Sequence, residues 1–128
     1  MLAAGLAVAG CVREQQRPDT VDPVLANAVL TSAAAQVQRC YRSPRIARAG
    51  KQIVTRVVVR LNTDGTLAEL PVVVGQTGIT PQNRVYAERM ASAASLAIIR
   101  CAPLRLPPEH YAQVWQTFEL KFSPRAAA

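Results

Sequence analysis

The sequence predicts an α+β fold in which three strands form one antiparallel sheet and two helices pack on one of its faces. Apolar residues recur at helical spacing in two stretches, about 22–39 and 80–101. They alternate with polar residues in stretches 53–61 and 114–122, as they do in strands with one buried face. A shorter β-prone stretch, 66–74, follows the first of these. The predicted element order is therefore helix, strand, strand, helix, strand.

The first helix is predicted to run from Asp22 to about Arg39. Asp22 is a favourable N-cap residue, and Pro23 suits the first helical position because its missing N–H is not needed there. The alanine-rich sequence favours a helix but leaves it a thin apolar face. That face consists of Leu25, Ala28, Val29, Ser32, Ala33, Gln36 and Cys40.

A β-hairpin is predicted after the basic loop 41–51. The first strand places alternate residues from Ile53 to Leu61 on its buried face. Asn62 to Gly65 predicts a tight turn, in which Gly65 takes a positive φ. The return strand, 66–74, contains Pro71, which cannot donate to a strand ladder, so this strand is predicted to be an outer one.

The second helix is predicted to begin with Thr80 as its N-cap and Pro81 at its first position. Its apolar stripe faces the sheet, and residues of this stripe are interpreted as core rather than as a site. The stripe consists of Tyr86, Met90, Ala93, Ala94, Ala97, Ile98 and Cys101, widened by Val85, Leu96 and Ile99.

The last strand carries the functional prediction. A right-handed crossover from the outer second strand, followed by antiparallel pairing with the first, gives the sheet order second, first, third. The last strand is then an edge whose unpaired backbone groups offer a template to a partner strand. Its buried face is expected to hold Val114, Gln116, Phe118, Leu120 and Phe122, and its outer face Trp115, Thr117, Glu119 and Lys121. The predicted partner-binding edge is Gln113, Val114, Trp115, Gln116, Thr117, Phe118, Glu119, Leu120, Lys121 and Phe122.

The formal net charge of +7 and the isoelectric point near 10.2 favour anionic partners. The arginines are scattered, and neither a nucleic-acid-binding motif nor zinc-ligand spacing accompanies them, so nucleic acid is not predicted as a partner. The densest group of cations is Arg42, Arg45, Arg48 and Lys51. This group is either a solvated loop or a patch that binds a polyanion.

The N-terminal stretch 1–11 is apolar but too short for a membrane-spanning helix, which needs about 20 apolar residues. Val8-Ala9-Gly10-Cys11 instead resembles the end of a bacterial lipoprotein signal, which would place a lipid on Cys11. No Lys or Arg precedes the apolar run, so an alanine-rich leader is the alternative.

Residues 12–23 are predicted to be a tether and 24–125 the folded domain. Cys40 and Cys101 then remain as a pair, which predicts a disulfide in an exported domain.

Residues 24–125 resemble the C-terminal domain of TolA, which is related in fold to that of TonB. The resemblance is carried by Val37-Gln38-Arg39-Cys40-Tyr41, Ser43-Pro44, Val57-Val58-Val59-Arg60-Leu61-Asn62, Asp64-Gly65, Ile98-Ile99-Arg100-Cys101, Pro103, Leu106-Pro107-Pro108-Glu109, Tyr111, Trp115, Glu119-Leu120 and Phe122-Ser123-Pro124-Arg125. It implies helices packed on a three-stranded antiparallel sheet. It also implies a periplasmic location, and partners in the Tol-Pal or TonB systems that add a strand to the sheet edge.

Force-transmitting members of that family carry a membrane helix and a long linker, whereas a dozen-residue tether spans at most about 40 Å. We therefore expect a stand-alone periplasmic binding module, anchored to the membrane through Cys11, that serves envelope integrity or transport coupling. The alternative is a structural envelope lipoprotein whose basic surface binds anionic wall or lipid polymers.

The sequence does not predict an enzyme. His110 is the one histidine, and the neighbouring Glu109 does not make it a catalytic pair. The cysteines lack a C-x-x-C spacing, and phosphate-loop and metal-ligand patterns are absent from the sequence. We expect no cofactor, no metal and no small-molecule substrate.

Overall fold

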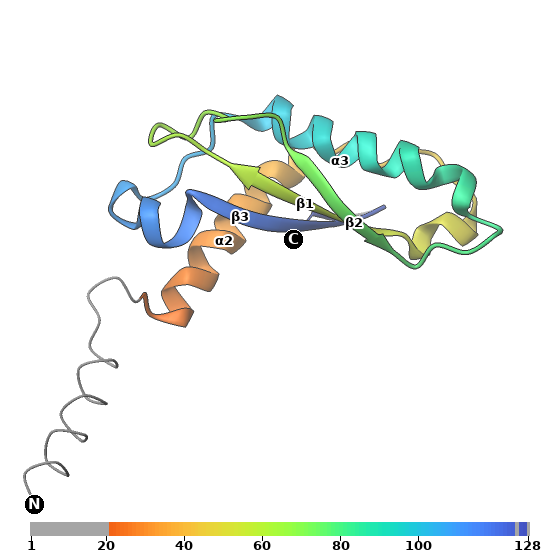
Figure 1. The fold of residues 1–128 in the computed structure, drawn as a ribbon, viewed down its shortest axis with the longest axis horizontal. Helices are drawn as coiled ribbons and strands as arrows, with labels where there is room; N and C mark the ends of the chain where they lie inside the picture. Colours follow the sequence, from red (N-terminus) through yellow and green to blue (C-terminus); the bar gives the residue numbers. More distant parts are fainter. Residues whose placement is uncertain (1–20, 125, 128) are drawn as a thin grey trace, which may run out of the picture.

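The computed structural model describes residues 21–124, 126 and 127 of the chain (Figure 1). The two long helices are α2 (Pro23–Gln38) and α3 (Ala87–Cys101), and the strands are β1 (Val54–Arg60), β2 (Val72–Thr77), β3 (Thr117–Ser123) and β4 (Ala126–Ala127). Short 3-10 helices are η1 (Arg48–Gln52), η2 (Arg84–Tyr86) and η3 (Pro108–His110), and η4 (Tyr111–Trp115) is a π-helical turn. The predicted α+β class is confirmed.

The strands form one antiparallel sheet in the order β2-β1-β3-β4. The predicted order of second, first and third strand is therefore confirmed, with the two-residue β4 added outside β3. Val58 pairs with Val72 on one side of β1, and Val59 pairs with Phe118 on the other. A β-bulge between Arg56 and Val57 interrupts the pairing of β1 with β2.

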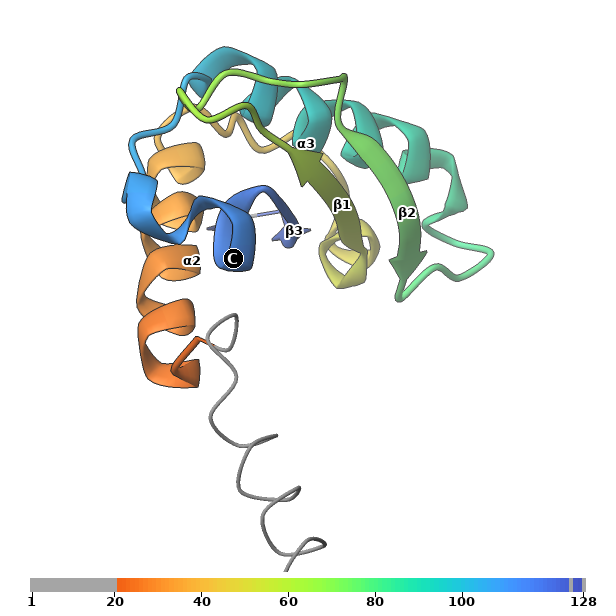
Figure 2. The ribbon, with the colours of Figure 1, turned by 60° about the vertical axis from the view of Figure 1, so that its left-hand side comes forward.

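The core lies where alternate residues of β1 and β3 meet the apolar sides of the helices. Figure 2 shows α2 and α3 beside the sheet. α3 contacts β1 and β2, whereas α2 contacts α3, η4 and β4. One continuous cluster holds Val29, Ala33, Ala34, Val37, Tyr41, Val57, Val59, Leu61, Ala94, Ala97, Ile98, Leu104, Val114, Trp115, Phe118, Leu120 and Phe122. That both helices cover the same face of the sheet stays a prediction.

The first helix begins as predicted. Asp22 is the N-cap of α2, and its carboxylate accepts a hydrogen bond of 3.0 Å from the backbone N–H of Val24. Pro23 occupies the first helical position. Both features are local, because an N-cap needs only the backbone of the next two or three residues.

The predicted bounds of the second strand are wrong. β2 begins after Pro71 rather than at Thr66, and it continues through Gly75 to Thr77. The turn itself is as predicted, with Gly65 at φ +85°. Residues 66–71, however, form only a single bridge, between Leu67 and Leu61, the residue that follows β1. Thr66 donates both its N–H and its hydroxyl to the carboxylate of Asp64, which holds this segment in local turns instead of a ladder.

The second helix starts later than predicted, at Ala87 rather than after Thr80. The reason is Asn83, a fully buried side chain whose oxygen accepts a 2.7 Å hydrogen bond from the N–H of Thr80. Its amide nitrogen donates to the carbonyls of Ala49 and Gly78, both at 2.9 Å. These bonds tie the turn before η2 to Ala49 in η1, so the chain enters α3 through a turn and a 3-10 helix and not as one continuous α-helix.

The prediction that three further residues widen the apolar, sheet-facing stripe of the second helix is also wrong. Val85, Leu96 and Ile99 remain 76%, 42% and 39% exposed. The inner side of the helix packs through Met90, Ala94, Ala97 and Ile98, which are fully buried. The outer side of α3 therefore carries apolar side chains that the core does not use.

Candidate functional site

The last strand is shorter than predicted. β3 spans Thr117–Ser123, whereas Gln113, Val114 and Trp115 lie in the π-helical turn η4 and Gln116 caps that turn. The predicted edge is therefore corrected to residues 117–123. Trp115, which the alternation placed on the outer face of the strand, is 1% exposed because the turn rotates it into the core.

Within β3 the predicted alternation holds. Phe118, Leu120 and Phe122 are buried, and Thr117, Glu119 and Lys121 are exposed. Glu119 forms an ion pair with Arg56 of β1, with 3.5 Å between the carboxylate oxygen and the guanidinium nitrogen. Both side chains are about two-fifths exposed, so this pair adds little stability.

The register shows which backbone groups of β3 point away from the sheet. Leu61 donates its N–H to the carbonyl of Gln116 at 3.0 Å, so that carbonyl faces the β1 side. Backbone groups alternate in direction along an antiparallel strand. The N–H and C=O groups of Thr117, Glu119 and Lys121 consequently point to the outer edge of the sheet.

The outer edge of β3 already accepts a strand from its own chain. β4 pairs antiparallel with the end of β3, through the partners Phe122–Ala127 and Ser123–Ala126. Pro124 lies between the two strands. Among the residues that the structure describes, 117–121 have no strand on this side.

Two aromatic residues of η4 fix the start of β3. The N–H of Gln116 closes the π-helical turn by donating to the carbonyl of Tyr111 at 2.7 Å, so it does not serve the ladder. The Tyr111 hydroxyl takes its place and donates to the carbonyl of Leu61 at 2.7 Å. Trp115 donates its indole N–H to the carbonyl of Pro107, also at 2.7 Å, and packs edge-on against the Tyr111 ring.

Tyr41, in the loop after α2, fixes the end of β3. Its hydroxyl donates to the carbonyl of Ser123 at 2.7 Å, and its ring centroid lies 5.4 Å from that of Phe122. Burial raises the pKa of Tyr41, and a hydrogen bond with Ser43 partly opposes this rise. The neutral hydroxyl is therefore the form that the fold holds.

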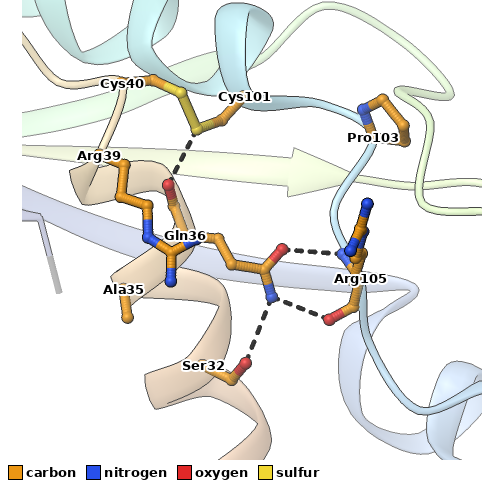
Figure 3. Close-up of a pocket in the computed structure, with 8 residues that line it drawn as sticks. All are labelled: Ser32, Ala35, Gln36, Arg39, Cys40, Cys101, Pro103 and Arg105. Carbon is orange, nitrogen blue, oxygen red and sulfur yellow. Dashed lines mark hydrogen bonds between the residues drawn. A yellow bond between two sulfur atoms is a disulfide. The ribbon is translucent and has the colours of Figure 1, made fainter.

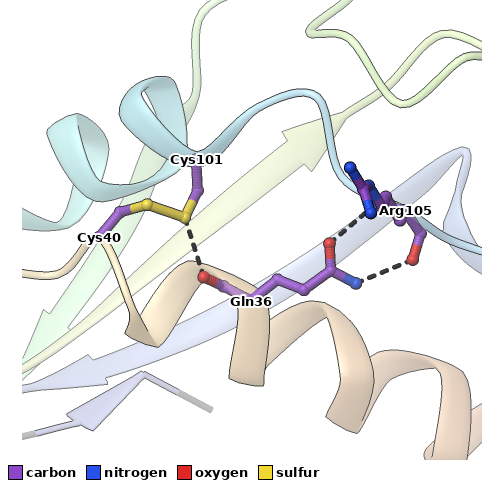
Figure 4. Close-up of a disulfide and its surroundings, with 4 residues drawn as sticks. All are labelled: Gln36, Cys40, Cys101 and Arg105. Carbon is purple, nitrogen blue, oxygen red and sulfur yellow. Dashed lines mark hydrogen bonds between the residues drawn. A yellow bond between two sulfur atoms is a disulfide. The ribbon is translucent and has the colours of Figure 1, made fainter.

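The predicted disulfide is confirmed. Cys40 and Cys101 are bonded across a sequence separation of 61 residues, with 5.6 Å between their Cα atoms (Figure 4). Cys101 is the last residue of α3, and Cys40 directly precedes Tyr41. Cys101 Sγ lies 2.8 Å from the carbonyl oxygen of Gln36, a close contact and not a hydrogen bond because a disulfide sulfur carries no proton.

Gln36 is a second link between α2 and the chain that leads to β3. Its side-chain oxygen accepts a 2.8 Å hydrogen bond from the N–H of Arg105, and its nitrogen donates to the carbonyl of the same residue at 2.8 Å (Figure 3). This two-way amide contact imitates a strand pairing. A surface cleft of about 570 Å³ lies beside it and the disulfide, lined by Ser32, Ala35, Gln36, Arg39, Cys40, Cys101, Pro103 and Arg105.

The opposite edge of the sheet is β2, and it is less suited to strand addition. Val72, Val73 and Val74 are exposed there. However, Pro71 and the β-bulge break the regular run of backbone groups, and both features protect edges from further pairing. β3 has neither along residues 117–121.

Other features of the sequence do not extend this candidate site within the described residues. His110 lies in η3, and the described part of the chain contains no group of three His, Cys, Asp or Glu residues arranged to hold a metal ion. Among the described helices, none has the length and apolar character needed to span a membrane. Cys11, the leader 1–11 and most of the tether lie outside the described residues.

Sequence patterns did not identify the residues that position the edge. Tyr41, Tyr111 and Gln36 act through contacts to residues 50 to 82 positions away, and no spacing rule connects them.

Comparison of the chain with protein-family models, curated proteins and solved structures finds no match. The TolA resemblance therefore stays a prediction.

Proposed function

We propose that this protein is a periplasmic protein-binding module of the Tol-Pal or TonB type, which recruits a partner peptide by β-strand addition to the outer edge of β3. The observation that carries the proposal is the pairing of β4 with β3. An edge that takes up the chain's own tail in antiparallel register has the geometry to take up a partner strand.

The length of exposed edge supports a short partner segment. Five residues, 117–121, have no described strand beside them, which at about 3.4 Å per residue corresponds to roughly 17 Å of ladder. The outward groups of Thr117, Glu119 and Lys121 would form the hydrogen bonds. The tyrosine and tryptophan contacts at both ends hold this edge in place, so a partner does not have to order it first.

The disulfide supports the proposed compartment. Disulfides persist in oxidising environments such as the bacterial periplasm and are rare in the cytosol. Anchoring through a lipid on Cys11 and partners from the Tol-Pal or TonB systems belong to the same proposal and rest on the sequence resemblances.

The test is a proline at Glu119. Proline removes the outward N–H of this residue but none of the bonds to β1, and Phe118 before it is extended, as proline requires. Thr117 is a poorer choice because Gln116 before it has helical angles, φ −59° and ψ −43°. The Glu119→Ala variant is the control for loss of the ion pair with Arg56. The Val73→Pro variant is the control for a proline placed on β2, the other edge of the sheet.

Binding is measured by calorimetry with synthetic peptides that tile the periplasmic segments of Tol-Pal and TonB-system proteins from the same genome. Glu119→Pro should weaken binding about tenfold or more, because the partner's carbonyl loses its donor at a cost of about 1–3 kcal/mol. Both control variants should bind within about twofold of the wild type. Removal of residues 126–128 should strengthen binding, since the partner then does not compete with β4.

Equal affinity of the wild type and a folded Glu119→Pro variant would refute the proposal. Salt-dependent binding of phosphatidylglycerol vesicles or polyphosphate, lost in a triple Arg42→Gln, Arg45→Gln, Arg48→Gln variant, would instead favour the lipoprotein that binds anionic polymers.

A further inference from the structure

A second concave surface lies on the outer side of α3, away from the sheet. The loop that follows α2 runs beside this helix and encloses with it a cleft of about 400 Å³. The cleft is lined by Arg42, Pro44, Arg45, Arg89, Ser92, Ala93, Leu96 and Arg100. Its two halves come from segments more than forty residues apart, so the tertiary structure alone brings these arginines together.

The four arginines of this cleft form no ion pair among the described residues, where the salt bridges are Arg56–Glu119 and Arg60–Glu69. Arg89 is nevertheless held in place: it donates to the carbonyl of Arg45 at 3.2 Å and lies 6.0 Å from the centroid of the Tyr86 ring. Four like charges around one concave surface repel one another, and an anion bound between them relieves that repulsion.

The floor of the cleft is apolar. Leu96 and Ala93 lie between Arg89 and Arg100, and Leu96 is 42% exposed. Ile99, three positions further along the helix, is 39% exposed beside them. A ligand that fills this cleft therefore needs an apolar group as well as negative charges.

We propose that this cleft binds an acidic peptide segment that carries carboxylates on both sides of an aliphatic side chain. The planar guanidinium groups match carboxylates with two parallel hydrogen bonds, and all four cations here are arginines. Arg89 and Arg100 are eleven residues apart, about three helical turns or roughly 16 Å, which is the length of about five extended residues.

The apolar floor distinguishes this ligand from other anions. A wall polymer of sugars and phosphates offers no aliphatic side chain for Leu96. The cleft is separate from the β3 edge, since the inner side of α3, and not its outer side, packs against β1 and β2. Occupation of one site does not require the other.

The probe is the acetylated and amidated peptide EELEELEE, labelled for fluorescence anisotropy, with QQLQQLQQ as the uncharged comparison. The cleft variant is the double Arg42→Gln, Arg100→Gln, and the matched control is Arg48→Gln, Arg84→Gln, which removes the same charge from exposed residues outside the cleft. Leu96→Ser tests the floor, and as a surface substitution it leaves the core intact. Glu119→Pro tests independence from the β3 edge.

The wild type and Glu119→Pro should bind EELEELEE equally, and neither should bind QQLQQLQQ. The cleft variant should weaken binding about tenfold, Leu96→Ser about threefold or more, and the control pair less than twofold. Four results would overturn the proposal: no binding of EELEELEE, equal weakening by the control pair, no effect of Leu96→Ser, or tighter cleft-dependent binding to phosphatidylglycerol vesicles or polyphosphate than to the peptide.

Discussion

Removal of the Cys40–Cys101 disulfide has an effect that can be calculated from the fold. The bond closes a loop with a sequence separation of 61 residues, which in the chain-entropy model stabilises the folded state by about 4 kcal/mol at 25 °C. Domains of this size are stable by only about 5–15 kcal/mol, so this one bond is a large share of the total. Both cysteines are replaced by alanine, since a single replacement would leave a thiol able to pair with Cys11.

The assay is urea unfolding followed by circular dichroism. With a slope of about 1–3 kcal/mol per molar urea, the double variant should unfold at a urea concentration lower by roughly 1.5–4 M. A reductant should reproduce this loss in the wild type and leave the double variant unchanged. The reasoning is refuted if the free energy of unfolding falls by less than about 1 kcal/mol, because the loop entropy alone predicts more.

Three further substitutions test residues that stabilise the fold. Trp115→Ala should lower the free energy of unfolding by about 3–5 kcal/mol in urea titrations, as expected for a buried aromatic, whereas a solvent-facing tryptophan would cost well under 1 kcal/mol. Gly65→Ala should cost more than about 1–2 kcal/mol, because the site has φ +85° and a methyl group there would collide with the carbonyl oxygen of Leu104; an unchanged melting temperature would contradict this. Burial raises the pKa of Tyr41 above its ordinary value of 10.0, so the unfolded chain loses that proton first and the wild-type stability should fall as the pH rises above about 10. In Tyr41→Phe this fall should be smaller, and stability curves of the two proteins that stay parallel between pH 8 and 11 would show that Tyr41 is not the cause.

The π-helical turn η4 shows why a correct periodicity produced a wrong strand boundary. The alternation of apolar and polar residues continues upstream of β3 to Val114, so the pattern alone extends the strand. The contacts that end it are Tyr111 with Leu61 and Trp115 with Pro107, which form after distant segments have packed together. A hydrogen bond of this kind leaves no periodic trace in the sequence.

The edge and the cleft differ in how much of them could be predicted. The sheet order follows from handedness and from the hairpin, so the sequence predicts that β3 lies at an edge. The tail strand β4 was not expected, because two alanines after a proline carry no strand pattern. In the cleft, the loop arginines stood out as a group, but Arg89 and Arg100 became part of it only through the packing of the loop against α3.

By itself, the sequence determined the α+β class, the order of the three main strands, the α2 cap at Asp22 and the pairing of Cys40 with Cys101. The cap depends only on residues next to it in the sequence, the class and strand order depend on apolar periodicity, and the cysteine pairing depends on the number of cysteines. All of these properties can be read from the sequence without knowledge of the tertiary structure. The tertiary structure alone decided where β2, α3 and β3 begin, that Trp115 is buried, and which arginines share a cleft. Those outcomes depend on single side chains such as Asn83 and Tyr111, which hydrogen-bond to backbone groups 34 and 50 residues away once the core has formed.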